Sequence, residues 1–168
     1  MLLKYLPPEK ILENNNEYKN GEELKVKGEE LNILRENGFD VEQALRYSQN
    51  DENLYKNLLK EYVLSSNEKI NSLKKFSEAL DLQNYGITVH ALKSSSKMIG
   101  AMNFSAECLS LEQAANNNDV NVIQEKNSSM LNHYEKILSV IKSAIIFNPD
   151  DNIKNYNDED EILEFLPE

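Results

Sequence analysis

The chain has 168 residues, enough for one domain with a real core plus tails, and 40% of these residues are hydrophobic. Its mean hydropathy of −0.61 is typical of a water-soluble protein. The formal charge of −11 argues against a nucleic-acid partner, because no basic patch is present to displace counterions from phosphates.

Neither a membrane span nor a metal site is predicted. No run approaches the ~20 apolar residues that cross a bilayer. The first residues also lack the basic-then-apolar order of a signal peptide. We therefore expect a cytoplasmic chain, either free or as the cytosolic part of a membrane-attached protein. Cys108 is the single cysteine, which excludes an internal disulfide, and we expect it in the core rather than as a reactive thiol.

Residues 1–28 are predicted to be a linker or N-terminal extension. They contain Pro7-Pro8, an asparagine run and two glycines, with only a short helical pattern after the prolines. We then expect two short helices over residues 29–37 and 41–48, the second with Asp40 as its N-cap. Longer helices follow over residues 51–65 and 66–80, with Ser66 as the predicted cap of the latter.

Residues 85–101, Y-G-I-T-V-H-A-L-K-S-S-S-K-M-I-G-A, place a histidine on one face of a helix. At ~100° per residue His90 shares this face with two cations and several small residues, namely Gly86, Lys93, Ser94, Lys97 and Ala101. Packing groups such as Leu92 lie on the opposite face. A lone histidine on an amphipathic helix is usually just a surface residue, so this spacing alone settles no function.

Two further helices complete the predicted bundle. One runs from an Asn103 cap to Ala115, and the other from an Asp119 cap to Ile145. His133, on the last helix, is predicted to be a surface or bundle-edge residue. With no strand pattern, this order predicts an all-α fold over residues 29–147: an antiparallel up-down four-helix bundle with additional short N-terminal helices.

Residues 148–168 are predicted to be an acidic and flexible tail, in which eight acids oppose the single base Lys154. Its apolar residues leave open a second interpretation, a short amphipathic segment that docks on a partner or on the bundle. These residues are Ile162, Leu163, Phe165 and Leu166.

The histidine helix resembles the motif of the histidine phosphotransfer (HPt) domain family, H-x-L-K-G/S-S followed by an aliphatic residue, glycine and often alanine. The matching residues are His90-Ala91-Leu92-Lys93-Ser94-Ser95 and Ile99-Gly100-Ala101. A second family feature, L-E-x-A on the next helix, matches Leu111-Glu112-Gln113-Ala114. The resemblance covers roughly residues 31–145. Ser94 stands where the family most often has glycine, and serine is still small enough to leave His90 accessible.

The resemblance implies a phosphocarrier without kinase activity of its own. His90 would accept phosphate from a receiver aspartyl phosphate and pass it to another receiver. Lys93 would stabilise the phosphate, while Lys97 is a second candidate for which a solvated lysine is an equal alternative. Glu112 would orient His90 by accepting a hydrogen bond from Nδ1, with a solvated glutamate as the equal alternative.

Receiver domains of response regulators or hybrid kinases are the partners that the resemblance implies. The expected contact surface around His90 comprises Gly86, Ile87, Ser94, Met98 and Ala101. We expect a monomer without cofactor or bound metal, because magnesium would belong to the acidic pocket of the receiver. The segment L-L-K-Y-L-P-P-E-K-I resembles the linker between a receiver and an HPt domain, which suggests a piece of a hybrid sensor histidine kinase or a related phosphorelay protein. The alternative function is a non-phosphorylated helical adaptor that binds receiver or kinase domains as a scaffold.

Overall fold

The computed structural model describes residues 30–145, so the predicted linker over residues 1–28 and the predicted tail over residues 148–168 lie outside the described residues. Residues 30–36 are helical, and the helices that follow are α2 (Val41–Tyr47), α3 (Glu52–Leu64), α4 (Ser66–Glu78), α5 (Leu82–Met98), α6 (Met102–Asn116) and α7 (Val120–Ala144). The described range contains no strand. None of its helices combines the length and apolar character needed to cross a membrane.

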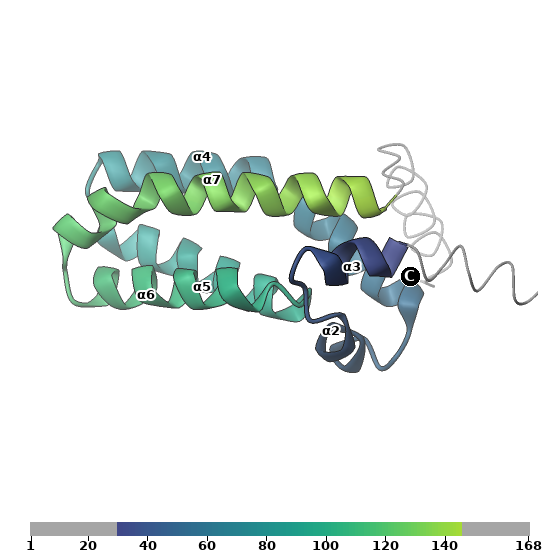
Figure 1. The fold of residues 1–168 in the computed structure, drawn as a ribbon. Coiled ribbons are helices and arrows are strands. Elements are labelled where there is room, and N and C mark those ends of the chain that lie inside the picture. Colours follow the sequence, from purple (N-terminus) through teal and green to yellow (C-terminus); the bar gives the residue numbers. More distant parts are fainter. Residues whose placement is uncertain (1–29, 146–168) are drawn as a thin grey trace, which may run out of the picture.

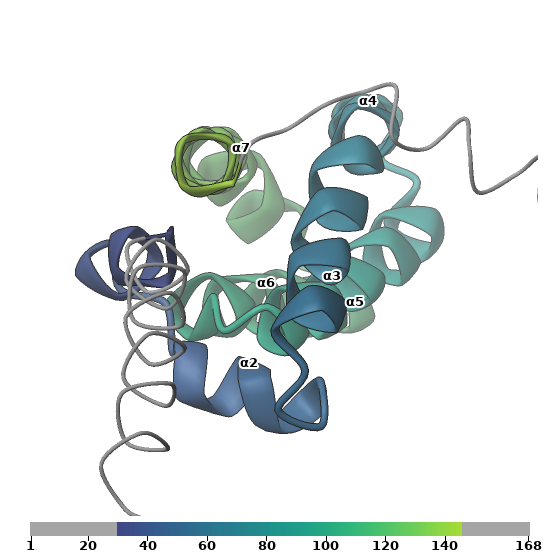
Figure 2. The same ribbon diagram turned by 90° about the vertical axis from the view of Figure 1, so that its right-hand side faces the viewer.

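The four long helices α4 to α7 form an antiparallel bundle (Figure 1). Each of them packs against the next one in the chain, and α7 closes the bundle by packing against α4. Seen along its axis, the bundle has α4 and α7 in one layer and α5 and α6 in the other (Figure 2). α2 and α3 gather at one end, where both contact α5. The predicted all-α bundle with additional N-terminal helices is confirmed.

Aliphatic side chains and three tyrosines without exposed surface fill the core: Tyr55, Tyr85 and Tyr134. Tyr85 donates a hydrogen bond to Asn127 at 2.9 Å, and Tyr55 donates to a backbone carbonyl of the α5 terminus at 2.9 Å. These bonds allow the hydroxyls of Tyr55 and Tyr85 to be buried. Cys108 is also buried, as predicted, and this burial raises the pKa of its thiol to about 12.

Aspartates start four of the helices. Each accepts a hydrogen bond from a backbone N–H of the first turn, which satisfies a donor that has no partner within the helix. The predicted caps Asp40 and Asp119 are confirmed, and Asp51 and Asp81 cap α3 and α5 in the same way.

Two predicted caps are wrong. Ser65 occupies the capping position of α4, without a side-chain hydrogen bond, because the Ser66 hydroxyl lies inside the helix and donates to the Val63 carbonyl at 2.6 Å. Asn103 lies within the first turn of α6, whose capping position is Ala101. The connection before α6 is shorter than the sequence pattern suggests, so the helix starts earlier.

Gly100 is the reason for this short connection. Its φ of +85° is in the left-handed region that favours glycine, and its carbonyl accepts a hydrogen bond from Asp40 N–H at 2.8 Å. A Cβ at Gly100 would lie 2.5 Å from the Asp40 carbonyl oxygen, so no side chain fits there. Ala101 follows this turn and is buried, with 5% of its surface exposed. Its predicted place on the contact surface is therefore wrong, because α5 ends before it and the helical spacing no longer applies.

Candidate functional site

His90 lies in the middle of α5 with 60% of its side chain exposed. The opposite face of this helix packs into the core through Tyr85, Val89 and Leu92. Helical periodicity alone thus turns the imidazole to solvent. Ser94 and Lys97 are exposed on the same helix, and the Ser94 hydroxyl donates to the His90 carbonyl at 3.1 Å.

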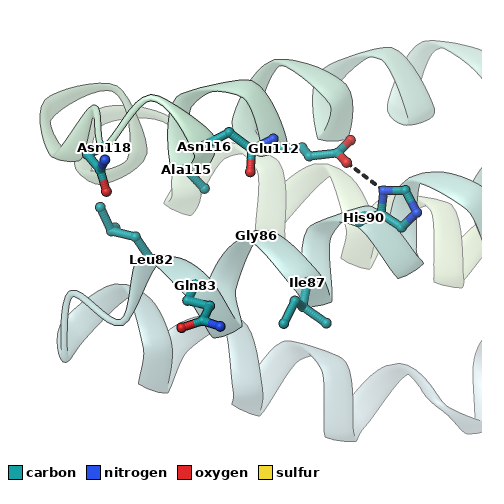
Figure 3. Close-up of a pocket in the computed structure, with 9 residues that line it drawn as sticks. All are labelled: Leu82, Gln83, Gly86, Ile87, His90, Glu112, Ala115, Asn116 and Asn118. Atoms are coloured by element: carbon teal, nitrogen blue, oxygen red, sulfur yellow. Dashed lines mark hydrogen bonds and ion pairs between the residues drawn. The ribbon is translucent and has the colours of Figure 1, made fainter.

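Glu112 of α6 connects His90 to Lys93. Its Oε1 atom lies 2.5 Å from His90 Nδ1 (Figure 3), and its Oε2 atom accepts a hydrogen bond from Lys93 Nζ at 2.6 Å. An ionised carboxylate only accepts hydrogen bonds, so this contact places a hydrogen on Nδ1 and leaves Nε2 of the neutral ring with a free lone pair. The structure thereby brings together three residues that the sequence singled out.

Electrostatics keep Glu112 ionised. Only 14% of its side chain is exposed, and this burial pushes its pKa upward. The hydrogen bonds from Lys93 and His90 outweigh burial, and the pKa of Glu112 lies below its ordinary value. A carboxylate therefore faces the imidazole at neutral pH.

A cavity of about 500 Å³ adjoins the exposed edge of this site (Figure 3). It is lined by Leu82, Gln83, Gly86, Ile87, His90, Glu112, Ala115, Asn116 and Asn118. The run Asn116-Asn117-Asn118 indicates only a turn between two helices, but Asn116 and Asn118 line the cavity because α5 and α6 are antiparallel. The only signal for this arrangement was the resemblance that placed Glu112 beside His90.

The predicted contact residues differ in their exposure. Ile87 is 61% exposed and Met98 is 41% exposed, and both lie on α5 with the exposed Ser94 between them in the chain. Gly86 is buried instead, and packs towards Ala115 of α6 while it lines the cavity. Ile87, Ser94 and Met98 therefore remain available to a partner.

The second histidine lies on the other side of α6. His133 Nδ1 is 2.7 Å from Glu107 Oε2, and its ring packs edge-on against Phe104 with centroids 5.2 Å apart. Its side chain is 41% exposed, which agrees with the bundle-edge position that the sequence predicts. Within residues 30–145, no group of three or more His, Cys, Asp or Glu side chains is arranged to hold a metal ion.

Comparison with known proteins gives a family and a fold. A sequence model of the Hpt domain family matches residues 57–144, more than half of the chain. The chain is also similar to the crystal structure of histidine-containing phosphotransfer protein B (HptB) from Pseudomonas aeruginosa PAO1, with 24% sequence identity and a TM-score of 0.52. That match covers 62% of this chain and 88% of the other. A comparison with curated proteins gave no significant match.

Proposed function

The chain belongs to the Hpt domain family, whose members carry phosphate on a histidine in phosphorelays, and from this premise we propose that His90 is the phosphoacceptor. It takes phosphate from the aspartyl phosphate of one receiver domain and passes it to another. One observation carries the assignment: His90 is solvent-exposed, while Glu112 contacts its Nδ1 atom and is itself bonded to Lys93.

The transfer needs no proton movement. The Nε2 lone pair of His90 forms a bond to phosphorus while the bond from phosphorus to the aspartate oxygen breaks, and its electrons leave with the carboxylate. Nδ1 keeps its hydrogen, so the ring gains positive charge, which the carboxylate of Glu112 stabilises. The same steps in reverse deliver the phosphate to the next receiver.

Lys93 supplies the cation for the phosphoryl oxygens. Its Nζ atom is bonded to Glu112 and lies 3.5 Å from His90 Nδ1. The Lys93 ammonium group therefore lies beside the His90 ring before transfer. It is attracted to the dianionic phosphoryl group once that group is on the ring. Lys97, exposed further along α5, is a second candidate for this role.

Receiver domains dock on the surface formed by Ile87, Ser94 and Met98. Their apolar and small side chains can approach a hydrophobic patch without shielding the imidazole. The domain works without a cofactor, since magnesium is supplied by the receiver, where it assists transfer. A monomer in the cytoplasm is sufficient for this reaction.

The test is incubation with a receiver that carries radiolabelled aspartyl phosphate. The chain becomes labelled, and the His90→Gln variant does not. His133→Gln, which removes the other histidine of the chain, is the matched control and keeps the label. Equal labelling of His90→Gln would overturn the assignment. Receiver binding without any transfer to the unaltered chain would favour the scaffold alternative.

A further inference from the structure

Two contacts join α5 and α6 on either side of the His90–Glu112 pair. The first involves Gly86, about one helical turn before His90. A Cβ atom at Gly86 would lie 3.3 Å from the Ala115 Cβ atom, closer than such atoms normally approach. The absence of a side chain at Gly86 therefore allows α6 to pack against α5 at this point.

The second contact lies on the other side of the pair. The Ser105 hydroxyl, from the start of α6, donates a hydrogen bond to the Lys93 carbonyl at 3.0 Å. Ser105 is buried and precedes Glu112 by about two helical turns. It connects the two helices through a backbone atom of a site residue, and it thereby restrains how far α6 can slide along α5.

The distance between His90 and Glu112 depends on both contacts. The two side chains come from different helices, and their hydrogen bond of 2.5 Å leaves little room for displacement. A shift of α6 along or away from α5 would strain both bonds of the Glu112 carboxylate, because His90 and Lys93 both belong to α5. Small displacements of this kind have large effects on a preorganised site.

We propose that Gly86, Ala115 and Ser105 are positioning residues, which hold Glu112 against His90 and so fix the imidazole tautomer with its hydrogen on Nδ1. Their effect is on the availability of the Nε2 lone pair, and they touch neither phosphate nor receiver. The inference rests on the proposed role of His90 as phosphoacceptor. It also gives Gly86 a different role from the receiver contact that the sequence predicts.

The first experiment changes the sizes of the side chains at Gly86 and Ala115. Gly86→Ala crowds the helices, and the double variant Gly86→Ala/Ala115→Gly restores the space. Nitrogen-15 NMR of the neutral imidazole reports which ring nitrogen carries the hydrogen. We expect the Nδ1–H fraction to fall in Gly86→Ala and to recover in the double variant. Alanine favours a helix and glycine disfavours it, so these substitutions also change stability. If Gly86 and Ala115 had only a structural role, the variants would shift the unfolding midpoint and leave the tautomer of His90 unchanged.

The second experiment removes the bond between the helices. Ser105→Ala lacks the hydroxyl and Ser105→Thr keeps it, while Ser66→Ala removes a buried hydroxyl elsewhere in the bundle and serves as the control. Phosphorylation by phosphoramidate, a small donor that needs no docking surface, measures the reactivity of His90 directly. We expect Ser105→Ala to slow this reaction by about three- to tenfold, and Ser105→Thr and Ser66→Ala to react like the unaltered chain.

The two sets of variants decide the proposal together. An unchanged tautomer in both Gly86→Ala and Ser105→Ala would overturn it, and if one of these variants fails to fold the other decides. Labelling of His90→Gln would instead overturn the proposed function, whatever the tautomer of His90 is. The two failures are therefore distinguishable.

Discussion

Replacing Glu112 by glutamine tests the charge in the site while it preserves the shape of the side chain. Glu112→Gln keeps an oxygen that can accept from His90 Nδ1, but it removes the negative charge that faces the ring. The bond to Lys93, 2.6 Å in the structure, also loses its charged acceptor. The substitution should therefore weaken the step in which the imidazole becomes positively charged.

The expected size of the effect follows from the geometry. The Glu112 side chain is only 14% exposed and its bond to His90 measures 2.5 Å, while the His90 side chain is 60% exposed, so water screens the interaction only in part. Hydrogen bonds to charged groups contribute about 1.5–3 kcal/mol. If this contribution is realised in the transition state, transfer slows by about 10- to 150-fold.

The assay is the rate of phosphate transfer from a labelled receiver, measured on a rapid-quench time scale. Glu107→Gln is the matched control, because Glu107 is on the same helix and makes the same kind of bond to His133 at 2.7 Å. We expect the control to transfer at the unaltered rate. A folded Glu112→Gln variant that transfers within about twofold of the unaltered chain would refute the reasoning.

Three further outcomes concern stability and reactivity. Gly100→Ala should lower the free energy of unfolding, measured in urea titrations, by more than about 2 kcal/mol. The substitution places a side chain on a left-handed backbone, with its Cβ only 2.5 Å from the Asp40 carbonyl oxygen. A loss below about 1 kcal/mol would contradict this account. The folded-state pKa of Glu112 lies below its ordinary value of 4.5, so the ionised group stabilises the fold above that pH. This stabilisation is lost as the pH falls through the lower folded-state pKa. Unfolding titrations of the unaltered chain and Glu112→Gln should therefore differ most near neutral pH and converge in acid, and a constant difference would speak against the assignment. Cys108, buried with its thiol pKa raised to about 12, should resist alkylation at pH 8 until the protein unfolds, so rapid modification of the native protein would show that the core opens there.

Local patterns in the sequence predict much of this fold. Asp40 and Asp119 mark helix starts because a carboxylate before an apolar periodic stretch satisfies free backbone donors, which needs no knowledge of the rest of the chain. His90 is exposed for a similarly local reason, since Val89 and Leu92, which turn to the opposite side of the helix, are apolar and buried. The contact between His90 and Glu112 is expected only through the family resemblance, because the spacing of residues within one helix does not show which residues of another helix pack against it.

The Ser66 cap is wrong for a local reason, because its hydroxyl bonds to the Val63 carbonyl, whereas the other incorrect predictions depend on contacts between distant segments. Ala101 becomes buried because α5 ends at Met98 and the turn at Gly100 packs against the start of α2, so Ala101 no longer follows the helical path. Asn103 loses its capping role for the same reason. Gly86 looks like an exposed small residue on a helical wheel, and only the packing of α6 shows that it is an interhelical spacer.

His90 and Glu112 are separated by only 22 positions in the chain. They belong to two consecutive helices that a single tight turn reverses, so little loop-closure entropy is required to bring them together. The reactive constellation can therefore assemble as a local folding event, before the first helices dock at the end of the bundle. The pairing of His90 with Glu112 is thus encoded in one short, contiguous segment of the chain.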